Sequence, residues 1–527
     1  MGTLLLLGAC ASIQTPLGGP KDTLAPKVKK ENPKNFGTNF QGKKIEIEFD
    51  EFIKLNNAFT EIGISPALES PLDVKTKKSL LEININNRLE PNTTYTINFG
   101  KAIGDVNENN LVKNYSYVFS TGPVLDSLSV SGTVKSALTN ETLKDITVFL
   151  LPISQDSLFG KKKPSIYTLS DEKGNFKLNN LKATQYHIYA LGEKSPDRIY
   201  NRGVDEIGFL DTLIDLKKNM TDLSFRLFKE EPAEFKIIEK RLDNDGRILL
   251  NFNKGLPALN IRELGNEGTL KNAPKEFSLK NDSVSIWLPE IKFDSLKVGI
   301  YDGDKLVDRA NILRNKRESL NRQPILSDNL FNNKLKPGSV LEITGSMPLT
   351  LSDSSRITLL ADSVLQKGWK IIKKEGSERK YILKYSFKPE KNYVLKVSDG
   401  AFTGISGIKT KAYAKKFIAE GPDNYGNLSL TVNPADLTQK YVIQLLNDQK
   451  NVVREDLVKG TTVLRYTNYN VGKYSIRLVL DKNKNGKWDT GNLETKTQPE
   501  KMWYYEKVIT LRANWDLEEK ISLPKDL

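Results

Sequence analysis

The stretch KKIEIEFDEFI, residues 43–53, alternates apolar and polar residues. Its apolar residues Ile45, Ile47 and Phe49 fall on one face of an extended chain, because successive side chains of a β-strand point to opposite faces. The charged residues between them fall on the other face. This pattern predicts a strand that is buried on one side and solvated on the other.

The same alternation recurs along the chain, as in TTYTINFG at residues 93–100 and YSYVFSTG at residues 115–122. Turn residues separate such runs about every 8 to 12 residues, and no long stretch has the 3.6-residue period of a helix. The sequence therefore predicts an all-β chain. Its 527 residues exceed the roughly 250–300 residues of a single core, so we expect a series of β-sandwiches of about 100 residues each.

Two distant stretches resemble each other. LEPNTTYTINFGKAIGD lines up with FKPEKNYVLKVSDGAFTG, so that Tyr95 matches Tyr393. Tyr95 also lies as far from Phe119 as Tyr393 does from Phe417. Internal similarity of this kind indicates modules that were duplicated and then diverged.

The block 24–123 resembles the bacterial Ig-like domain at the front of many lipoproteins of the Bacteroidota type. The resemblance rests on GGPKDTLAPKV, NPKNFGTNFQGKKIEIEFDEFI, LEPNTTYTINFGKAIGDVNENN and YVFSTGP. The block 124–228 resembles carboxypeptidase-regulatory-like, or prealbumin-like, modules through VSGTV and SDEKGNFKLNNLKATQYHIYAL, and that family name implies no peptidase activity. The last block resembles the end of the same lipoprotein family through YSIRLVLDKNKNGKWDTGN.

These resemblances and the internal repeats together imply an order of parts for the whole chain. We expect a signal-peptide remnant at 1–9, a lipidated cysteine and tether at 10–23, an Ig-like domain at 24–123, a carboxypeptidase-regulatory-like sandwich at 124–228, Ig-like β modules at 229–315 and 316–421, and a C-terminal β-sandwich at 422–527. The predicted fold is thus a tandem of Ig-like and prealbumin-like sandwiches behind a lipidated tether.

The amino-terminal sequence MGTLLLLGACASIQTPLGGPKD is a short apolar run that ends at the single cysteine. Leu7-Gly8-Ala9-Cys10 resembles a bacterial lipobox, which implies cleavage before Cys10 and attachment of lipid to its thiol. The run before Cys10 has no Lys or Arg and is shorter than the roughly 15–30 residues of a complete signal, so the start of the signal stays open. The resemblance implies a lipid anchor in the outer membrane and leaves the membrane face undecided.

Composition limits the chemistry. The 79 Lys and Arg against 65 Asp and Glu give a net charge of +14, but no nucleic-acid-binding motif organises the basic residues, so no nucleic-acid partner is expected. With one cysteine and one histidine, Cys/His zinc sites and Ser-His-Asp or Cys-His catalysis would need His187. His187 lies in the alternating stretch QYHIYAL, which predicts an ordinary strand position.

Catalytic motifs give no support for an enzyme. The sequence contains no phosphate loop, GxSxG elbow, HExxH or dinucleotide fingerprint. Asp50 and Glu51 are neighbours in a strand and therefore face opposite sides, which argues against a catalytic carboxylate pair. The distances between other carboxylates cannot be read from the sequence, so an unrecognised hydrolase stays open as a further hypothesis.

An aromatic stretch near the carboxyl terminus is the candidate contact surface for a partner. Trp503, Tyr504 and Tyr505 are consecutive, so their rings must point to both faces of a strand, and at least one ring is expected to be exposed. Trp515 alternates with Leu517 and is expected in the core.

The stretch LDKNKNGKWDTGN has the spacing of a calcium loop. Candidate ligands are the side chains of Asp481, Asn483, Asn485 and Asp489 and the carbonyl of Lys487. Asn492 stands at the twelfth position, where a bidentate Glu is usual, so any Ca²⁺ is expected to bind with a dissociation constant of about 10⁻⁴ to 10⁻³ M. A hairpin turn that uses Asn and Gly explains the same residues without metal and is preferred.

The resulting hypothesis is a non-enzymatic, lipid-anchored scaffold or accessory subunit of an outer-membrane protein complex. Its expected partners are an integral β-barrel protein, as in assembly or secretion machinery, and other lipoproteins. The alternative is a surface lipoprotein that binds a glycan or another ligand.

Overall fold

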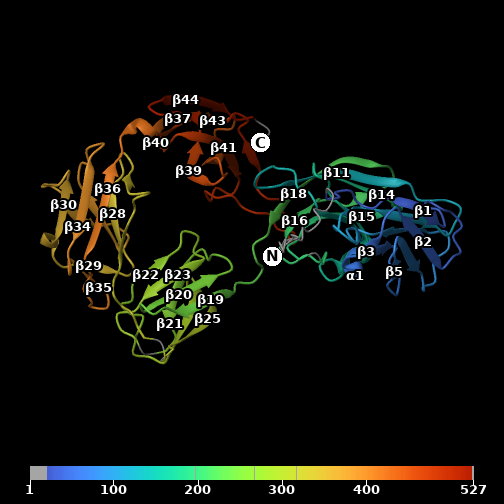
Figure 1. Cartoon of the computed structure of the whole chain (residues 1–527), viewed down its shortest axis with the longest axis horizontal. Coiled ribbons are helices and arrows are strands. Elements are labelled where there is room, and N and C mark those ends of the chain that lie inside the picture. Colours follow the sequence, from blue (N-terminus) through green and yellow to red (C-terminus); the bar gives the residue numbers. More distant parts are fainter. Residues whose placement is uncertain (1–20, 196, 266–267, 316, 318, 525–527) are drawn as a thin grey trace, which may run out of the picture. The chain divides into compact units, whose positions relative to one another are not determined.

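The computed structural model describes residues 21–195, 197–265, 268–315, 317 and 319–524. Cys10 and the start of the predicted tether lie outside the described residues. The all-β prediction is confirmed, with 48% strand and 3% helix. The chain divides into two compact units: unit 1 holds the chain up to Glu230 together with Leu493–Thr497, and unit 2 holds the rest. Figure 1 shows the strands gathered in successive groups along the colour scale.

Module 1, with strands across residues 28–120, is built around β2 (Lys44–Phe49). Ile45, Ile47 and Phe49 on this strand are at most 1% exposed, as the alternation predicts. Its three sheets have the orders β1 (Val28–Asn32), β2, β6 (Leu80–Asn84), β5 (Asp73–Lys77); β10 (Ser116–Ser120), β7 (Thr94–Asn98), β4 (Gly63–Ser65); and β3 (Ile53–Leu55), β8 (Ile103–Asp105), β9 (Leu111–Val112). A short helix, α1 (Ala58–Glu61), precedes β4.

Module 2, with strands across residues 128–229, has one long sheet that folds over its own core. Its order is β13 (Ile166–Leu169), β12 (Thr147–Pro152), β15 (Gln185–Gly192), β16 (Glu206–Phe209), β18 (Met220–Lys229), β11 (Leu128–Ser136), β14 (Asn175–Leu181), with β17 (Ile214–Asp215) beside β15. A 3-10 helix, Ile153–Leu158, follows β12. β13 and β14 therefore stand at opposite ends of the sheet although they are consecutive in the chain.

Unit 2 contains three further sandwiches, each with a separate hydrophobic cluster. Module 3 (residues 237–313) has the orders β19 (Ile237–Leu242), β20 (Arg247–Phe252), β23 (Ser283–Trp287), β22 (Lys275–Phe277) and β21 (Leu259–Glu263), β24 (Ser295–Asp302), β25 (Lys305–Leu313). Module 4 (residues 326–419) has the orders β26 (Leu326–Asp328), β28 (Leu341–Gly345), β33 (Lys380–Lys384), β32 (Lys370–Lys373); β27 (Lys334–Leu335), β36 (Tyr413–Ala419), β34 (Asn392–Val397), β30 (Ile357–Ala361), β31 (Val364–Leu365); and β29 (Leu349–Leu351), β35 (Phe402–Gly404).

Module 5 (residues 425–522) ends the chain. It pairs β40 (Thr462–Asn470), β37 (Tyr425–Asn433), β44 (Asp516–Ser522) in one sheet and β39 (Val452–Lys459), β38 (Lys440–Leu446), β41 (Gly472–Asp481), β42 (Met502–Tyr504) in the other, with β43 (Ile509–Leu511) also beside β41. Short 3-10 helices lie at Ser354–Arg356 in module 4 and at Pro422–Asn424 before module 5.

Basic side chains join neighbouring modules inside unit 2. Arg379 of module 4 binds both carboxylate oxygens of Glu276 in module 3, at 2.7 and 3.0 Å, and its guanidinium lies 4.9 Å from the ring centroid of Trp287. Lys336 of module 4 places its ammonium 5.7 Å from the ring centroid of Tyr425 and 5.1 Å from that of Tyr469, both in module 5. Cation–π contacts of this kind stabilise each junction most where water is excluded.

The predicted repeat is confirmed by the local geometry of modules 1 and 4. Tyr95 lies opposite Phe119, with ring centroids 5.4 Å apart, and Tyr393 lies opposite Phe417 at 5.5 Å. Each tyrosine hydroxyl accepts a hydrogen bond from a backbone N–H five residues upstream, at 2.9 Å in module 1 and 2.7 Å in module 4. This contact resembles the tyrosine corner that fixes the loop before a strand in Ig-like sandwiches.

Replacing either tyrosine by phenylalanine keeps the ring and removes the acceptor. We expect Tyr95→Phe and Tyr393→Phe each to cost about 1 kcal/mol, the net worth of one hydrogen bond, and to speed exchange of the amide of Glu90 or Lys388 respectively. Hydrogen exchange by mass spectrometry reports both effects. Tyr301→Phe is the control, because the Tyr301 hydroxyl makes no hydrogen bond to the described residues. Unchanged exchange at Glu90 and Lys388 would show that the hydroxyls are not used.

Candidate functional site

The predicted calcium loop begins at the end of β41 with Asp481, which is fully buried. The two carboxylate oxygens of Asp481 accept hydrogen bonds from the backbone N–H of Asn485 at 3.0 Å and of Gly486 at 2.9 Å. The side-chain amides of Asn483 and Asn485 donate to Asp489 at 2.6 and 2.7 Å, and the N–H of Lys487 donates to Asn485. The structure thus brings the predicted residues together through hydrogen bonds within the loop.

Glu500 is a further carboxylate of this loop and was not among the predicted residues. It accepts hydrogen bonds from the N–H of Lys482 at 2.8 Å and of Asp489 at 3.1 Å. Burial, together with the nearby Asp489 and Asp481 charges, raises the pKa of Glu500. In the part of the chain that the structure describes, no group of three or more His, Cys, Asp or Glu side chains could hold a metal ion. Calcium binding therefore stays a prediction.

The preferred hairpin turn is wrong in extent. β41 and β42 are antiparallel neighbours, but residues 482–501 separate them. Within this connection positive φ occurs at Gly486, as expected, and at Lys484 and Lys496, but at none of the asparagines. Trp488 from this connection packs against Val442, Val479 and Met502 on the outer face of the sheet, and its indole N–H donates to the carbonyl of Glu500. The connection covers the sheet with a second small core.

The predicted contact surface, Trp503, Tyr504 and Tyr505, is half-buried. Trp503 and Tyr505 pack against the main core of module 5, and Tyr504 packs against the small core beneath Trp488. All three rings are partly buried, so the expectation of an exposed ring is wrong, because a long connection covers the second face of the strand. The expectation for Trp515 is also wrong: this side chain is 53% exposed and contacts Arg512.

His187 occupies a strand position, as predicted. It lies on β15 with its Nε2 3.5 Å from a carboxylate oxygen of Asp156. Burial lowers the pKa of His187. The pair is an ion pair only while the histidine is protonated.

Modules 1 and 2 meet at a junction that is held by side-chain contacts within unit 1. Asn114 of module 1 forms two hydrogen bonds with the peptide groups of Leu169 on β13: its amide N–H donates to the carbonyl and its amide oxygen accepts from the N–H, both at 3.0 Å. Asn98 donates to the carbonyl of Tyr167 on the same strand. Two side-chain amides of module 1 thus satisfy three outward peptide groups of β13 that would otherwise be open.

Arg198, in the connection between β15 and β16, completes the junction. It is 4% exposed and donates to the carboxylate of Glu61 and to the carbonyl of Thr60 in module 1, the latter at 2.6 Å. Its guanidinium lies 3.8 Å from the ring centroid of Tyr167, whose hydroxyl donates to the carbonyl of Glu61. Burial raises the pKa of the Tyr167 hydroxyl, so this group stays a donor.

Glu193 holds the backbone of Arg198 in place through a hydrogen bond. Its carboxylate accepts the backbone N–H of Arg198. Burial raises the pKa of Glu193 to about 7, against the opposing effect of this hydrogen bond. Glu193 therefore titrates near neutral pH within the connection that carries the junction arginine.

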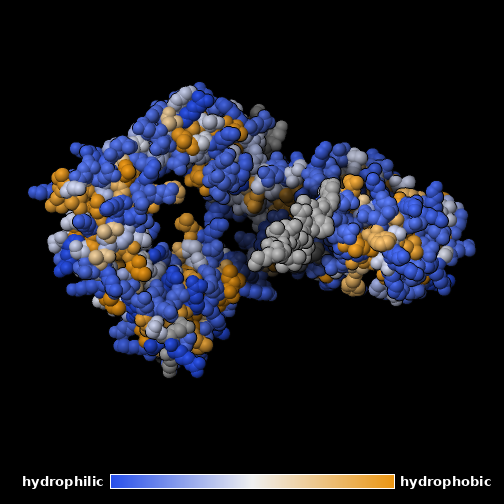
Figure 2. All heavy atoms as spheres, in the orientation of Figure 1, coloured by the Kyte–Doolittle hydropathy of each residue, from blue (hydrophilic) through white to orange (hydrophobic). Residues whose placement is uncertain are grey.

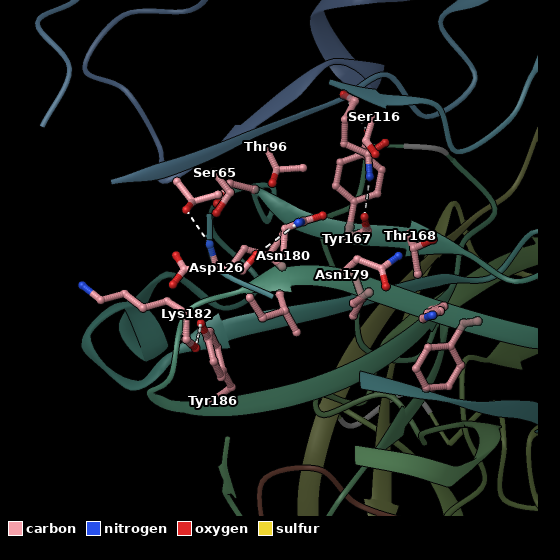
Figure 3. A pocket seen from close by; sticks show the side chains of 18 of the residues that line it. Ser65, Thr96, Ser116, Asp126, Tyr167, Thr168, Asn179, Asn180, Lys182 and Tyr186 are labelled. Atoms are coloured by element: carbon pink, nitrogen blue, oxygen red, sulfur yellow. Dashed lines mark hydrogen bonds between the residues drawn. The ribbon is translucent and has the colours of Figure 1, made fainter. Parts of the chain in front are cut away.

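A pocket of about 950 Å³ lies next to the junction, between β13 and β14 of module 2 and the β10-β7-β4 sheet of module 1; we call it the slot. Figure 3 shows Ser65 and Thr96 on one side and Asn179, Asn180 and Lys182 on the other. Neither the junction nor the slot was predicted. The sequence signal was limited to polar residues on the outward positions of strands, which also suit a solvated face.

Breaking the buried ion pair should loosen the junction. We expect Arg198→Met to destabilise unit 1 by about 3 kcal/mol and to speed amide exchange in β13, because it leaves the buried Glu61 carboxylate without its counter-charge, with only the N–H of Lys101 still donating to it. Adding Glu61→Gln should restore part of the loss. Arg241→Met, on an exposed ion pair of module 3, is the matched control and should change little. Equal effects of Arg198→Met and Arg241→Met in calorimetry would contradict the assignment.

Glu193 should give unit 1 a pH dependence. The pKa of Glu193 is about 7 in the folded state and 4.5 ordinarily. Between pH 4.5 and pH 7, the folded state therefore keeps a proton on Glu193 that the unfolded state has lost. Stability from this group is present below about pH 4.5 and is lost as the pH rises through about 7. We expect the melting temperature of Glu193→Gln to fall less than that of the parent between pH 5 and pH 8. Parallel curves for the two proteins would refute this role of Glu193.

Comparison with known proteins identifies one part of the chain. Residues 22–121 match the family model of the bacterial Ig-like domain, which confirms the predicted identity of module 1. No curated protein matches the chain. The predicted likeness of residues 124–228 to prealbumin-like modules stays a prediction.

Solved structures with Ig-like modules were also found. They include the major pilin subunit BcpA of Bacillus cereus (8% identity, covering 75% of this chain and 99% of that chain, TM-score 0.15) and the Bacillus anthracis TIE protein (11% identity, 96% and 75%, TM-score 0.14). A third is the surface layer protein SbsC, domains 1–6 (12% identity, 93% and 68%, TM-score 0.14). Such low TM-scores carry no argument about function. The finding that stands is that module 1 is a bacterial Ig-like domain.

Proposed function

We propose that this protein is a non-enzymatic, lipid-anchored scaffold or accessory subunit of an outer-membrane protein complex and acts through protein–protein contacts. The observation that carries the proposal is the way its sandwiches are joined. Arg198 and Arg379 each form an ion pair with a glutamate of the neighbouring module, and Lys336 stacks on two aromatic rings of the neighbouring module. Side chains that reach from one module to the next suit a protein that keeps binding surfaces at fixed separations.

The surface is consistent with this role. On the face seen in Figure 2, hydrophilic residues predominate and hydrophobic residues occur in small groups. Exposed apolar side chains such as Leu279, Phe331 and Trp515 are spread over modules 3, 4 and 5. Isolated apolar residues are normal on a surface, so the proposal names no single contact patch.

Membrane attachment is assigned to Cys10. No helix in the described part of the chain is long and apolar enough to span a membrane. The lipobox-like sequence before Cys10 supports an acyl anchor, and several acyl chains hold a protein firmly where one chain binds only marginally. We place the protein at the outer membrane and leave its face open.

The test is purification from native membranes in mild detergent after brief cross-linking. We expect a stoichiometric complex with an integral β-barrel protein, and we expect Cys10→Ser to give a folded protein in the soluble fraction. The Cys10→Ser protein also serves as the control for contacts that form only after lysis. Recovery of the parent as a monomer that binds polysaccharide would favour the glycan-binding alternative, and turnover lost on a single carboxylate substitution would favour a hydrolase.

A further inference from the structure

The slot is bordered by an edge of β14 that no other strand of the described residues covers. A turn joins β13 to β14, with the N–H of Asp171 donating to the carbonyl of Asn175 at 2.8 Å, and beyond this bond the strands diverge to opposite ends of the sheet. The N–H of Val134 donates to the carbonyl of Gly174 at 2.9 Å, and Gly132 lies opposite Phe176. In an antiparallel pair, residues whose peptide groups bond the neighbouring strand alternate with residues whose peptide groups point away from it. Gly174 and Phe176 bond toward β11, so the N–H and carbonyl of Lys177, the next residue, point away from β11.

The two borders of the slot differ. Asn98 and Asn114 cap β13, where they satisfy the N–H and carbonyl of Leu169 and the carbonyl of Tyr167. No group in the described residues hydrogen-bonds to the peptide N–H or C=O of Lys177 on the outer edge of β14. An open edge is a template for another extended chain, and peptide ligands commonly bind by adding a strand to such an edge.

The opposite wall offers unused hydrogen-bonding groups. Ser65 on β4, Thr96 on β7 and Ser116 on β10 line the slot, and their hydroxyl groups make no hydrogen bonds to other described residues. Asn179 lines the other side, and its side-chain amide makes no hydrogen bond to another residue of the described chain. These donors and acceptors match a ligand that carries polar groups along its whole length.

We propose that the slot binds an extended peptide segment of another protein by strand addition to β14. The volume of about 950 Å³ lies at the upper end of the roughly 300–1,000 Å³ range of ligand pockets, which suits a short peptide better than a single side chain. Four carboxylates, Glu90, Asp126, Asp171 and Asp222, and two lysines, Lys177 and Lys182, line it, so basic side chains on the peptide are favoured.

A glycan fits the slot less well. Sugar rings bind best where an aromatic face is free to stack. The face of Tyr167 is covered by Arg198 and its hydroxyl is bound to module 1, while Tyr186 is 2% exposed and donates to the carbonyl of Lys182. The peptide edge of β14 is the stronger recognition element.

The test starts with a random heptapeptide library displayed on phage and selected on the full chain. Enriched peptides are synthesised in two forms, with N-methyl groups on the odd or on the even residues. In a strand, the N–H groups of every second residue point toward a given neighbouring strand. If the peptide adds to β14 as a strand, the form with methyl groups on those residues should bind at least tenfold more weakly, and the other form should keep its affinity. Ser116→Trp, which fills the slot from module 1, should weaken binding at least tenfold, with unchanged melting temperature as the check on folding.

Several results would overturn the proposal. These are failure to enrich any peptide over the Ser116→Trp protein, equal effects of the two methylation patterns, or preferential binding of maltoheptaose. Lys177→Pro gives an independent check, because it removes the edge N–H and leaves the bonds from β14 to β11 in place, and retained affinity in this protein would count against strand addition. The inference does not rest on the scaffold proposal, since the membrane-complex experiment can succeed or fail independently.

Discussion

The arrangement of unit 1 depends on the capping of one strand edge. β13 ends the sheet of module 2, and the side-chain amide of Asn114 pairs with the peptide groups of Leu169 much as a neighbouring strand would. Because a buried peptide group without a partner costs about 1–3 kcal/mol, module 2 can bury this edge only while module 1 supplies the amide. The buried Arg198–Glu61 pair then makes separation of the modules still more unfavourable.

This constraint also creates the slot. The Asn98 and Asn114 contacts hold β13 against module 1, while β14 follows β11 to the far end of the sheet. The two strands therefore separate after their turn and leave polar space between them. In unit 2, Arg379 joins modules 3 and 4 through its ion pair with Glu276 and its contact with Trp287, and Lys336 joins modules 4 and 5 through its contacts with Tyr425 and Tyr469. Part of the excess of basic residues thus has a structural role.

Local features of the fold could be predicted from the sequence, and long-range contacts could not. The alternation around Ile47 predicted a half-buried strand because the two-residue period of a strand shows in consecutive residues. The matching of Tyr95 with Tyr393 predicted a repeated module, and each of these hydroxyls bonds a residue only five positions away. Arg198 lies 137 residues from Glu61, and no periodic pattern connects them. Glu500 was missed since it lies outside the usual loop length, and the aromatic rings of 503–505 were misplaced because a distant tryptophan covers their strand.

The most direct test of this account is the distance between modules 1 and 2 in solution. Spin labels on Lys75→Cys and Lys217→Cys, both at exposed positions, can be introduced in the Cys10→Ser protein, which has no other cysteine. Pulsed electron paramagnetic resonance then gives the distribution of the distance between the labels. We expect a single narrow distribution that broadens in Arg198→Met. A broad distribution in the parent, unchanged by Arg198→Met, would contradict it.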